Sequence, residues 1–505
     1  MNAAEAPHTV PTAAPLPEDM TSDEVVADGA PRQSTLDEKI RHVFGHAAMD
    51  KRRLPSSGLK GRAIPSYVAE WVLDYLVPGE GNLSPADVAK VQEWTARVVP
   101  GAGDANRTRD RLLRGEMLKV LTLVQVDAIL TRGRQERIAL LPLLGIVDAE
   151  IVPGLSEEFP ALLNEGMWGI AQIMKGSTGV TVTSFKPMQA TVDLRLWKEA
   201  RREFTFEEWR DVLLLSMGYA PSAFGDGEKL LLLCRLLPLV QKSVHLMELA
   251  PKGTGKSYLY ENISPRVRVA GGNVTPAKLF VDNAKGTPGY LSRYKVVVLD
   301  EVQTLKFTAP EEIIANLKMF LANAQIQRGT TPVGSDCGFV MLANIALDEQ
   351  QRPIHELLVR DLPPFMQETA FLDRLCGLLP GWRIRKLTGE CFASGWGLKA
   401  DFFGDTLLML REDGELESEA DSRLRFSPHS YGRNEKGIRA NMNALFKLLF
   451  PHGEASDDEF YRCCLAPAIR LRQGIWDQLY FMDAENHKYA RDLRETVIWD
   501  TPATG

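Results

Sequence analysis

The sequence predicts a mixed α/β protein whose central part is a nucleotide-binding domain built on a parallel sheet. Three observations predict this fold class. A glycine-rich loop covers residues 250–257, an apolar strand at 244–249 precedes it, and a second apolar strand at 296–299 ends in Asp300 and Glu301. Continuous apolar runs of this kind are typical of parallel strands that are buried on both faces.

The composition is that of a globular protein with several domains. The chain has 505 residues, of which 45% are hydrophobic and 25% charged, and these values are ordinary for globular domains. The net charge of -7 excludes a basic surface over the whole protein, so any contact with nucleic acid requires a local patch.

Neither the cysteines nor the apolar segments indicate a metal site, secretion or a membrane. The six cysteines lack C-x-x-C spacing, and we expect buried thiols rather than zinc ligands. No apolar run approaches the roughly 20 residues that a membrane-spanning helix needs. The N-terminus lacks the basic and then apolar order of a signal peptide. We therefore expect a cytoplasmic protein.

Composition and periodicity divide the rest of the chain. The N-terminal segment is rich in Ala, Pro and acidic residues and cannot bury enough apolar surface to become ordered. Further along, five short aliphatic segments separated by Gly and Pro indicate a small β-barrel or sandwich. The predicted parts are a disordered tail, an N-terminal helical region, a small β-domain for DNA binding, a helical lead-in, the nucleotide-binding core, and a helical lid with the C-terminal region, at 1–34, 35–116, 117–195, 196–242, 243–390 and 391–505.

The glycine-rich loop has the residue types that hold nucleotide phosphates. Small residues let backbone N–H groups wrap the phosphates, and the following helix points its positive end at them. Lys256 is placed to reach the β- and γ-phosphates of ATP, and the Ser257 hydroxyl can bind Mg²⁺. Ala250 replaces a glycine, which we expect to be tolerated unless its backbone needs a positive φ. The expected nucleotide contacts are Ala250, Pro251, Lys252, Gly253, Thr254, Gly255, Lys256, Ser257 and Tyr258.

Polar residues at two later strand ends suit the hydrolysis of the nucleotide. Asp300 closes a buried strand, where a carboxylate is costly unless it meets a cation, so we expect it to join Ser257 in holding Mg²⁺. Glu301 would polarise the attacking water as a general base. Asn344 ends an apolar strand and would orient that water or sense the γ-phosphate; the alternative is a capping residue.

Arg374 follows these strands in the segment Phe371–Arg374. A guanidinium accelerates phosphoryl transfer when it neutralises charge on the phosphates, and a neighbouring subunit often supplies it. The alternative for Arg374 is a surface pair with Asp373.

The order of these motifs resembles that of an AAA+ ATPase. Four stretches resemble more closely the BrxL family, the Lon-related AAA+ proteins of BREX anti-phage defence, and the resemblance extends over about residues 36–475. These stretches are residues 202–213, 230–233, 249–260 and 445–453. The resemblance implies an AAA+ core with a helical lid, preceded by helices and a small OB-like β-barrel.

The resemblance also implies residue roles and partners. Arg374 would act on a neighbouring subunit's nucleotide, and Arg439 would be the second sensor in the lid, with Arg433 as the alternative. ATP and Mg²⁺ are the implied cofactors. The implied assembly is a hexameric ring, able to stack in pairs, with double-stranded DNA in its channel and other BREX proteins as partners. The core is also similar to that of minichromosome-maintenance helicases, in which a hairpin, here residues 324–335 with Arg328, faces the channel.

The chain departs from longer members of the family. Those relatives continue into a Lon-like C-terminal domain, whereas this chain stops soon after the lid and shows no plausible Ser–Lys dyad region. We therefore expect a short form without intrinsic protease activity.

One segment, residues 107–137, is locally basic, with a local excess of four positive charges. Such a patch suits sequence-independent contact with the DNA backbone; the alternative is a solvated charged face. The expected DNA contacts are Arg107, Arg109, Arg111, Arg114, Arg132 and Arg134, together with Arg328 of the hairpin.

Three functions compete at this stage. The first is a ring-forming AAA+ ATPase that binds double-stranded DNA in phage defence. The second is an ATP-dependent protein unfoldase that works with a separate protease, for which Phe280 would be the candidate pore residue. The third is a DNA-binding scaffold that uses ATP only to assemble.

Overall fold

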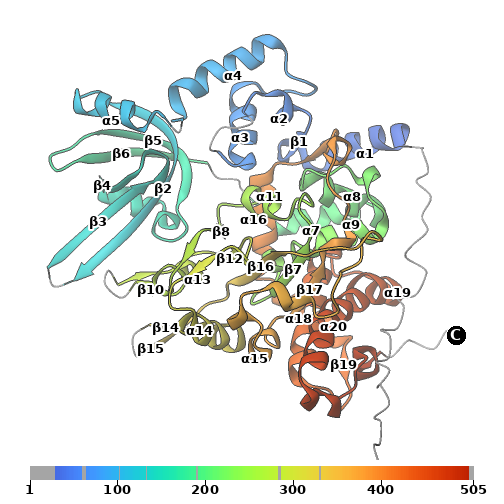
Figure 1. The fold of residues 1–505 in the computed structure, drawn as a ribbon. Helices are drawn as coiled ribbons and strands as arrows, with labels where there is room; N and C mark the ends of the chain where they lie inside the picture. The colour runs from blue at the N-terminus through green and yellow to red at the C-terminus, as the bar shows by residue number, and fades with distance from the viewer. Residues whose placement is uncertain are drawn as a thin grey trace, which may run out of the picture.

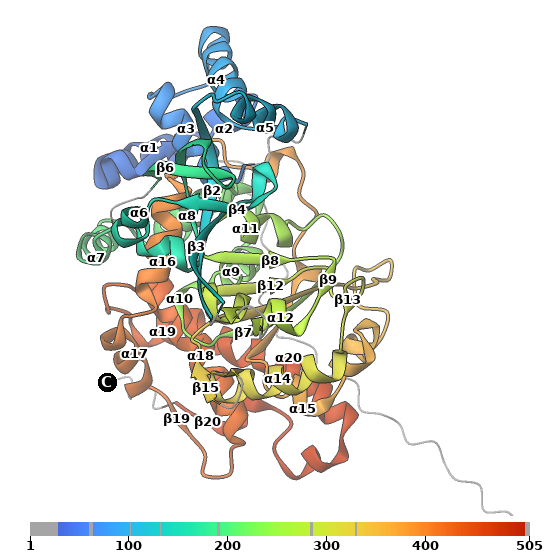
Figure 2. The ribbon, with the colours of Figure 1, turned by 90° about the vertical axis from the view of Figure 1, so that its left-hand side faces the viewer.

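The computed structural model describes residues 29–59, 64–101, 103–131, 133–188, 192–282, 286–328 and 331–499. N-terminal helices and a β-barrel lie at one end of the molecule, the parallel sheet lies in the middle, and the C-terminal helices lie at the other end (Figures 1 and 2). Within the described residues, no helix combines the length and the apolar character needed to cross a membrane.

The N-terminal region is helical, as its periodicity predicts. Ser84 caps one helix through a reciprocal capping box with Asp87, and Pro85 is its first residue. The elements are α1 (Gly29–Phe44), β1 (Ala48–Asp50), α2 (Arg53–Ser56), α3 (Ser66–Leu76), α4 (Pro85–Val98) and α5 (Ala105–Leu113).

Helix α1 corrects the predicted boundary of the disordered tail. Residues 1–28 lie outside the described part of the chain, but α1 begins at Gly29, six residues before the expected start of structure. Leu36 and Ile40 are buried in the main core. Once these turns are held by packing, adding helical residues on their N-terminal side costs little, because propagation is easier than nucleation.

The five aliphatic segments form a closed five-stranded barrel, which confirms the prediction of a small barrel. Its strands follow the order β2-β3-β4-β6-β5 and are antiparallel except for the pair β4 and β6. Short helix α6 (Pro153–Glu158) connects the third strand to the fourth. The strands are β2 (Leu118–Thr131), β3 (Arg134–Leu141), β4 (Ile146–Ile151), β5 (Met167–Lys175) and β6 (Val180–Pro187).

The lead-in helices carry the chain to the central sheet, whose five parallel strands have the order β17-β7-β16-β12-β8. Each of the inner strands β7 and β12 is fully buried, as continuous apolar runs require. The lead-in helices are α7 (Leu194–Arg202), α8 (Phe206–Ser216), α9 (Asp226–Cys234) and α10 (Leu237–Val240). The strands are β7 (His245–Ala250), β8 (Val267–Ala270), β12 (Val296–Leu299), β16 (Gly338–Asn344) and β17 (Gly377–Pro380).

Short helices and small ladders connect these strands. The helices are α11 (Lys256–Asn262), α12 (Pro276–Leu279), α13 (Tyr290–Arg293), α14 (Pro310–Asn323) and α15 (Thr369–Leu372). The ladders pair β9 (Asn273–Val274) with β13 (Lys306–Phe307), β10 (Val281–Asp282) with β11 (Thr287–Pro288), and β14 (Gln325–Arg328) with β15 (Thr331–Gly334). The last pair is the hairpin expected at residues 324–335.

The C-terminal region is mainly helical and packs against the sheet through α20, which lies on edge strand β17. Five of the six cysteines are buried free thiols, as expected, and Cys463 is partly exposed. The elements are β18 (Trp396–Leu398), α16 (Ala400–Leu410), α17 (Gly414–Ser422), β19 (Arg425–Phe426), α18 (Gly432–Leu449), α19 (Asp457–Phe460), α20 (Ala466–Met482) and β20 (Val497–Ile498).

The N-terminal region docks on the segment that follows the nucleotide-binding core. Strand β1 pairs with β18, although almost 350 residues separate them. Beside this ladder, the Glu70 carboxylate accepts bonds from the Lys51 amine and from the Ala400 backbone N–H, both at 2.7 Å. Lys51 and Glu70 are 6% and 3% exposed. A carboxylate buried with two donors is a strong and specific link between distant parts of the chain.

We predict that Glu70→Ala weakens this docking by about 3 kcal/mol, because it leaves the Lys51 charge buried without a partner. Calorimetry should show the first thermal transition at a lower temperature. Glu93→Ala is the matched control, since Glu93 pairs with Arg97 on the exposed surface of α4 and should change stability by less than about 0.5 kcal/mol. Equal effects of the two substitutions would contradict this account.

Candidate nucleotide-binding site

The candidate site lies at the carboxyl edge of the central sheet. Strands β7, β16 and β12 are neighbours and run parallel, so the residues that follow them meet at one edge. The glycine-rich loop follows β7, Asn344 ends β16, and Asp300 follows β12. Loops at the carboxyl ends of parallel strands are the usual ligand sites of open α/β sheets.

The glycine-rich loop depends on two glycines with left-handed backbone. Gly253 has φ 90° and Gly255 has φ 73°, which other residues rarely adopt. At Gly255, an added Cβ would lie 2.5 Å from Leu387 Cδ1 and 2.9 Å from Tyr219 Oη. The backbone N–H of Leu387 also donates to the Gly253 carbonyl. The loop is therefore held from outside, as a preformed cradle requires.

Ala250 is tolerated for a structural reason. It is the last residue of β7, is fully buried and is absent from the left-handed region. Its neighbour across the sheet edge is Gly381, where an added Cβ would lie 2.6 Å from the Ala250 Cβ. The extra methyl group of Ala250 thus occupies space that Gly381 leaves free.

A buried ion pair beneath the loop escaped the sequence analysis. Arg235 and Glu248 are 0% and 1% exposed, and the Arg235 Nη2 donates to Glu248 Oε1 at 2.6 Å. Arg235 Nη1 also donates to the Thr254 carbonyl of the loop at 3.0 Å. The signal available in the sequence was an arginine inside the leucine-rich run 230–239, next to a strand containing one glutamate.

The Lys256 amine contacts the end of β16. Its Nζ donates to Asn344 Oδ1 at 2.9 Å, so the loop lysine and the end of β16 meet directly. Lys256 is 7% exposed, and burial lowers the pKa of its amine, opposed by the carboxylates of Glu248 and Asp300. Its partner Asn344 is a neutral amide, which leaves the cation able to transfer to a phosphate oxygen.

Gln303 fixes the backbone of Asn344 and was also missed from the sequence. Its Nε2 donates to the Asn344 carbonyl at 2.5 Å, and its Oε1 accepts from the Asn344 N–H at 3.2 Å. This two-point contact joins the segment after β12 to the end of β16. The contact therefore fixes the position of Asn344 relative to the segment that carries Glu301, which lies two residues before Gln303.

Asp300 and Glu301 follow β12, and Glu301 has an unusual backbone conformation. Glu301 has φ 48°, which is uncommon for a residue other than glycine. Its N–H donates to Asp300 Oδ1 at 2.9 Å, and its carbonyl accepts from the Thr304 N–H at 2.7 Å. Such strained residues cluster at functional sites, where surrounding bonds hold them in place.

The donors at this edge fit a nucleotide with Mg²⁺. Ser257 and Asp300 offer a hydroxyl and a carboxylate, the hard oxygen ligands that Mg²⁺ prefers. Glu301, whose carboxylate is exposed, follows Asp300 directly in the chain. Tyr258 is 43% exposed, and its hydroxyl lies 3.2 Å from the Ser66 hydroxyl, so helix α11 of the loop also touches α3.

Arg374 lies at the opposite edge of the sheet. It precedes β17, and the Cys376 N–H donates to the carbonyl of His245, the first residue of β7. His245 and Ala250 are five strand residues apart, roughly 16 Å. This separation exceeds the reach of an arginine side chain, so Arg374 does not complete the site of its own chain.

The segment around Arg374 is held by the C-terminal helices. The Asp373 carboxylate accepts from Arg472 at 2.7 Å, from the Tyr431 hydroxyl at 2.9 Å and from Arg433. Arg374 itself donates to the Ala370 carbonyl, while its Nε is buried without a partner among the described residues. The Asp373–Arg374 surface pair is therefore not formed, because Asp373 is already bound by other residues.

Two protein-family models match this chain. Residues 180–492 match "Lon-like protease BrxL-like, ATPase domain", and residues 42–174 match "BREX system Lon protease-like protein BrxL N-terminal". The chain belongs to the BrxL family. The first match contains the whole candidate site described above, and the second contains β1, α2–α5 and most of the barrel.

Curated BrxL proteins are similar over most of this chain. The Lon-like protease BrxL of Escherichia coli O9:H4 (strain HS) is 25% identical over 469 residues, which are 91% of this chain and 66% of that protein. The Lon-like protease BrxL of Bacillus cereus (strain H3081.97) is 29% identical over 408 residues, 78% of this chain and 60% of that protein. The chain thus spans less than two thirds of the length of either relative.

One solved structure shows a looser likeness. It is a full-length MCM homolog from Methanopyrus kandleri, with 13% identity and a TM-score of 0.36 over 74% of this chain and 81% of that one.

In this BrxL family member, helix α18 carries both arginines considered for the second sensor, and their contacts differ. Arg433 binds Asp373, and its cation adds to burial in lowering the pKa of the Arg374 guanidinium. Arg439 instead pairs with Asp421 at 2.9 Å and lies over the Phe426 ring. The structure therefore brings Arg433, the alternative candidate, next to Arg374, and does not bring Arg439 there.

The expected DNA contacts on α5 are mostly engaged within the chain. Each arginine there pairs with an acid or with backbone carbonyls, so the local patch is more neutral than its sequence suggests. The contacts are Arg107 to Asp104, Arg109 to the Leu144 and Gly145 carbonyls, Arg111 to Glu116, and Arg114 to Asp110 and Glu116. Arg132 lies outside the described residues, and only the backbone is described for Arg134 and Arg328.

We predict that Gln303→Ala lowers kcat for ATP hydrolysis about tenfold while nucleotide affinity stays within about twofold, because the substitution frees Asn344 without removing a phosphate contact. Turnover and fluorescent-nucleotide binding measure the two effects. Gln350→Ala, which removes an exposed amide from the loop after β16, is the control. A loss confined to affinity would contradict a positioning role.

A second prediction separates the two lid arginines. Arg433→Ala should lower turnover at least tenfold, because it removes a cation beside Arg374, whereas Arg439→Ala should retain most turnover. The two variants are compared by steady-state ATPase assay at equal oligomer concentration. If Arg439→Ala lowered turnover more than Arg433→Ala, the result would favour Arg439 as the second sensor, the role that the family resemblance implies.

Proposed function

We propose that this chain is a ring-forming AAA+ ATPase that hydrolyses ATP with Mg²⁺ and engages double-stranded DNA in BREX-type phage defence. The observation that carries the proposal is the meeting of Lys256, Asn344 and the Asp300–Glu301 segment at one sheet edge, with Arg374 at the other. One chain then carries the two parts of a phosphoryl-transfer site at opposite edges of its sheet, so a neighbouring subunit would supply the arginine for each nucleotide.

The residues at the carboxyl edge would divide the chemistry among them. Backbone N–H groups of residues 251–257 would bind the phosphates, with Lys256 leaving Asn344 to contact the terminal phosphate. Ser257 and Asp300 would hold Mg²⁺, which neutralises charge on the phosphate oxygens when bound. Glu301 would take a proton from the attacking water, and Asn344, fixed by Gln303, would orient that water.

Assembly would complete the site. Arg374 of one subunit, with Arg433 beside it, would stabilise negative charge on the nucleotide of the next subunit. The bonds of Asp373 to Tyr431, Arg433 and Arg472 support this role, because they tie the arginine-bearing segment to the lid helices. Such an interface is head-to-tail, and a head-to-tail interface forms a ring when its rotation closes; we propose that it closes here as a hexamer able to stack in pairs.

The N-terminal barrel and the β14–β15 hairpin would provide contact with DNA. The barrel's strand order and the helix between its third and fourth strands support the OB-like assignment, and OB folds bind oligonucleotides. Because the α5 arginines are paired internally, duplex contact through them would require exchange of these pairs for phosphates, and its affinity should fall steeply with salt.

One observation weighs against the protein-unfoldase alternative. Phe280, the candidate for gripping polypeptide in the pore, is only 4% exposed and belongs to the main hydrophobic core. Proteolysis is named for the relatives, and this chain matches less than two thirds of their length, so we do not extend that activity to it.

We predict that Glu301→Gln lowers hydrolysis at least 100-fold and retains ATP and Mg²⁺ binding, because the amide cannot accept the proton. Wild-type turnover should rise with double-stranded DNA and stay unchanged with an unfolded protein. Single-turnover assays measure hydrolysis by the variant, and filter binding measures its binding of ATP. Wild-type hydrolysis by the variant would exclude Glu301 as the base, and stimulation by unfolded protein alone would favour the unfoldase.

A further inference from the structure

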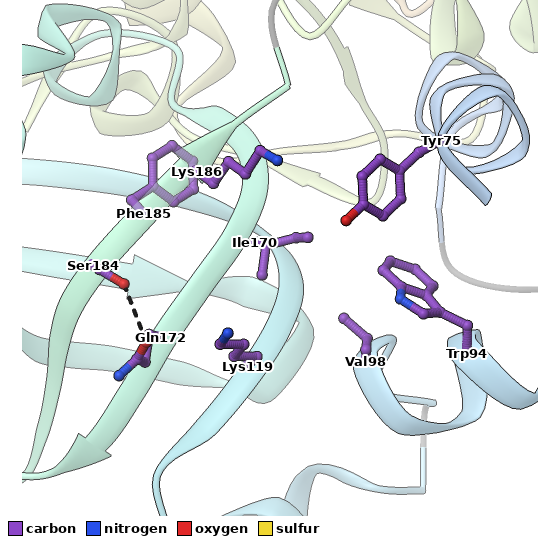
Figure 3. Close-up of a pocket in the computed structure, with 9 residues that line it drawn as sticks. All are labelled: Tyr75, Trp94, Val98, Lys119, Ile170, Gln172, Ser184, Phe185 and Lys186. Atoms are coloured by element: carbon purple, nitrogen blue, oxygen red, sulfur yellow. Dashed lines mark hydrogen bonds between the residues drawn. The ribbon is translucent and has the colours of Figure 1, made fainter.

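A cavity of about 440 Å³ lies between the N-terminal helices and the outer face of the barrel. Helices α3 and α4 form one wall with Tyr75, Trp94 and Val98, and strands β2, β5 and β6 form the other (Figure 3). Its size lies within the roughly 300–1,000 Å³ that is usual for ligand sites. None of the residues of the nucleotide-binding site lines it.

The helical wall presents two aromatic rings, of which Trp94 is partly buried against the core of the N-terminal region and Tyr75 is largely exposed. Tyr75 is 52% exposed and stacks on Trp71 with ring centroids 5.2 Å apart and planes 4° apart. The Trp94 ring lies 6.4 Å from the Tyr75 ring at 57°. A large exposed tyrosine held flat by a second ring is a preorganised stacking surface.

The barrel wall presents positive charge and amide groups. Lys119 and Lys186 are exposed, and the Lys186 Nζ lies 5.4 Å from the centre of the Tyr75 ring. No acidic residue lines the cavity, and neither lysine forms an ion pair within the described part of the chain. Gln172, which bonds Ser184 at 3.4 Å, adds polar groups that can read the edge of a ring (Figure 3).

This cavity differs from the basic segment around α5. There each arginine is paired with an acid or a carbonyl, whereas here Lys186 lies over the Tyr75 ring and Lys119 lines the same cavity, which has no carboxylate among its lining residues. Unpaired cations beside an exposed aromatic surface match a ligand with flat rings and negative charges. Nucleic acid has both, but in a duplex the faces of the bases are covered by their neighbours.

We propose that the cavity binds single-stranded nucleic acid, with an unpaired base stacked on Tyr75 beside Trp94 and flanking phosphates on Lys119 and Lys186. Stacking of bases on aromatic side chains, together with lysines along the backbone, is the general mode of sequence-tolerant single-strand binding. This goes beyond duplex engagement. It gives the N-terminal region a means to hold a strand that has left its partner.

The direct test uses an oligothymidylate containing 5-iodouracil, a base that crosslinks to stacked aromatic residues on irradiation. The full-length protein is irradiated with this probe, and the crosslinked peptide is identified by mass spectrometry. The expected product joins the probe to Tyr75 or Trp94. A crosslink elsewhere, or none, with the probe bound, overturns the proposal.

Two variants extend the test by fluorescence anisotropy with labelled oligothymidylate. Tyr75→Ala removes a half-exposed ring, and Lys119→Glu/Lys186→Glu reverses two exposed charges, so neither needs to disturb the core. Each should weaken single-strand affinity about fivefold or more. Lys175→Glu, an exposed charge at the end of β5 outside the cavity, is the matched control and should change affinity less than about twofold.

Duplex affinity and ATP turnover in the same variants separate this proposal from the proposed function. In Tyr75→Ala, which removes no charge, both should remain at the wild-type level while single-strand affinity falls; in the double lysine variant, whose Lys119 lies in the basic segment 107–137, only ATP turnover is expected to stay unchanged. Equal loss of single-strand affinity in the control and the cavity variants overturns the proposal in favour of general charge attraction. Displacement of the probe by an acidic peptide but not by unlabelled oligothymidylate overturns it in favour of a protein partner.

Discussion

The parallel pairing of β7, β16 and β12 is the constraint on which the rest of the site depends. The three strands are neighbours and run in the same direction. The loop lysine, the Asn344 amide and the Asp300 carboxylate therefore lie at the same edge of the sheet, and no long connection is needed to bring them together. Gln303 then adds the local bond that the sheet cannot supply, since it ties the end of one strand to the segment after another. The buried Arg235–Glu248 pair supports the loop from below.

In the proposed mechanism, the same sheet also separates the two parts of the site within one chain. A guanidinium anchored before β17 belongs to the amino edge, and the lid helices hold it there through Asp373. The bonds of Asp373 therefore connect the Arg374 segment, at the edge of the sheet, to helices α18 and α20 of the same subunit. On the other side, helix α11 contacts α3 through Tyr258 and Asn262, both bonded to Ser66. These two bonds connect the helix that follows the loop to the N-terminal region.

Local sequence signals predicted most of the elements but not the contacts between distant ones. The loop at 250–257, the strands at 296–299 and 339–343 and the barrel strands carry strong periodic or motif signals, and the structure confirms their type. The pairing of β1 with β18, the Glu70 bonds and the Gln303 contact join residues far apart in sequence, so no local pattern marks them. The neighbours of Arg439, Asp421 and Phe426, also lie outside its own helix, so the local pattern around Arg439 does not mark them.

The central claim is that each site is shared by two subunits, and subunit complementation tests it most directly. A Lys256→Ala chain and an Arg374→Ala chain, each expected to be inactive alone, are co-expressed with different tags and purified as mixed oligomers. Random mixing pairs an intact phosphate loop with an intact arginine at about a quarter of the interfaces, so turnover should recover to about that fraction. Mixed oligomers as inactive as either variant alone, or full turnover by the Arg374→Ala chain alone, would contradict the claim.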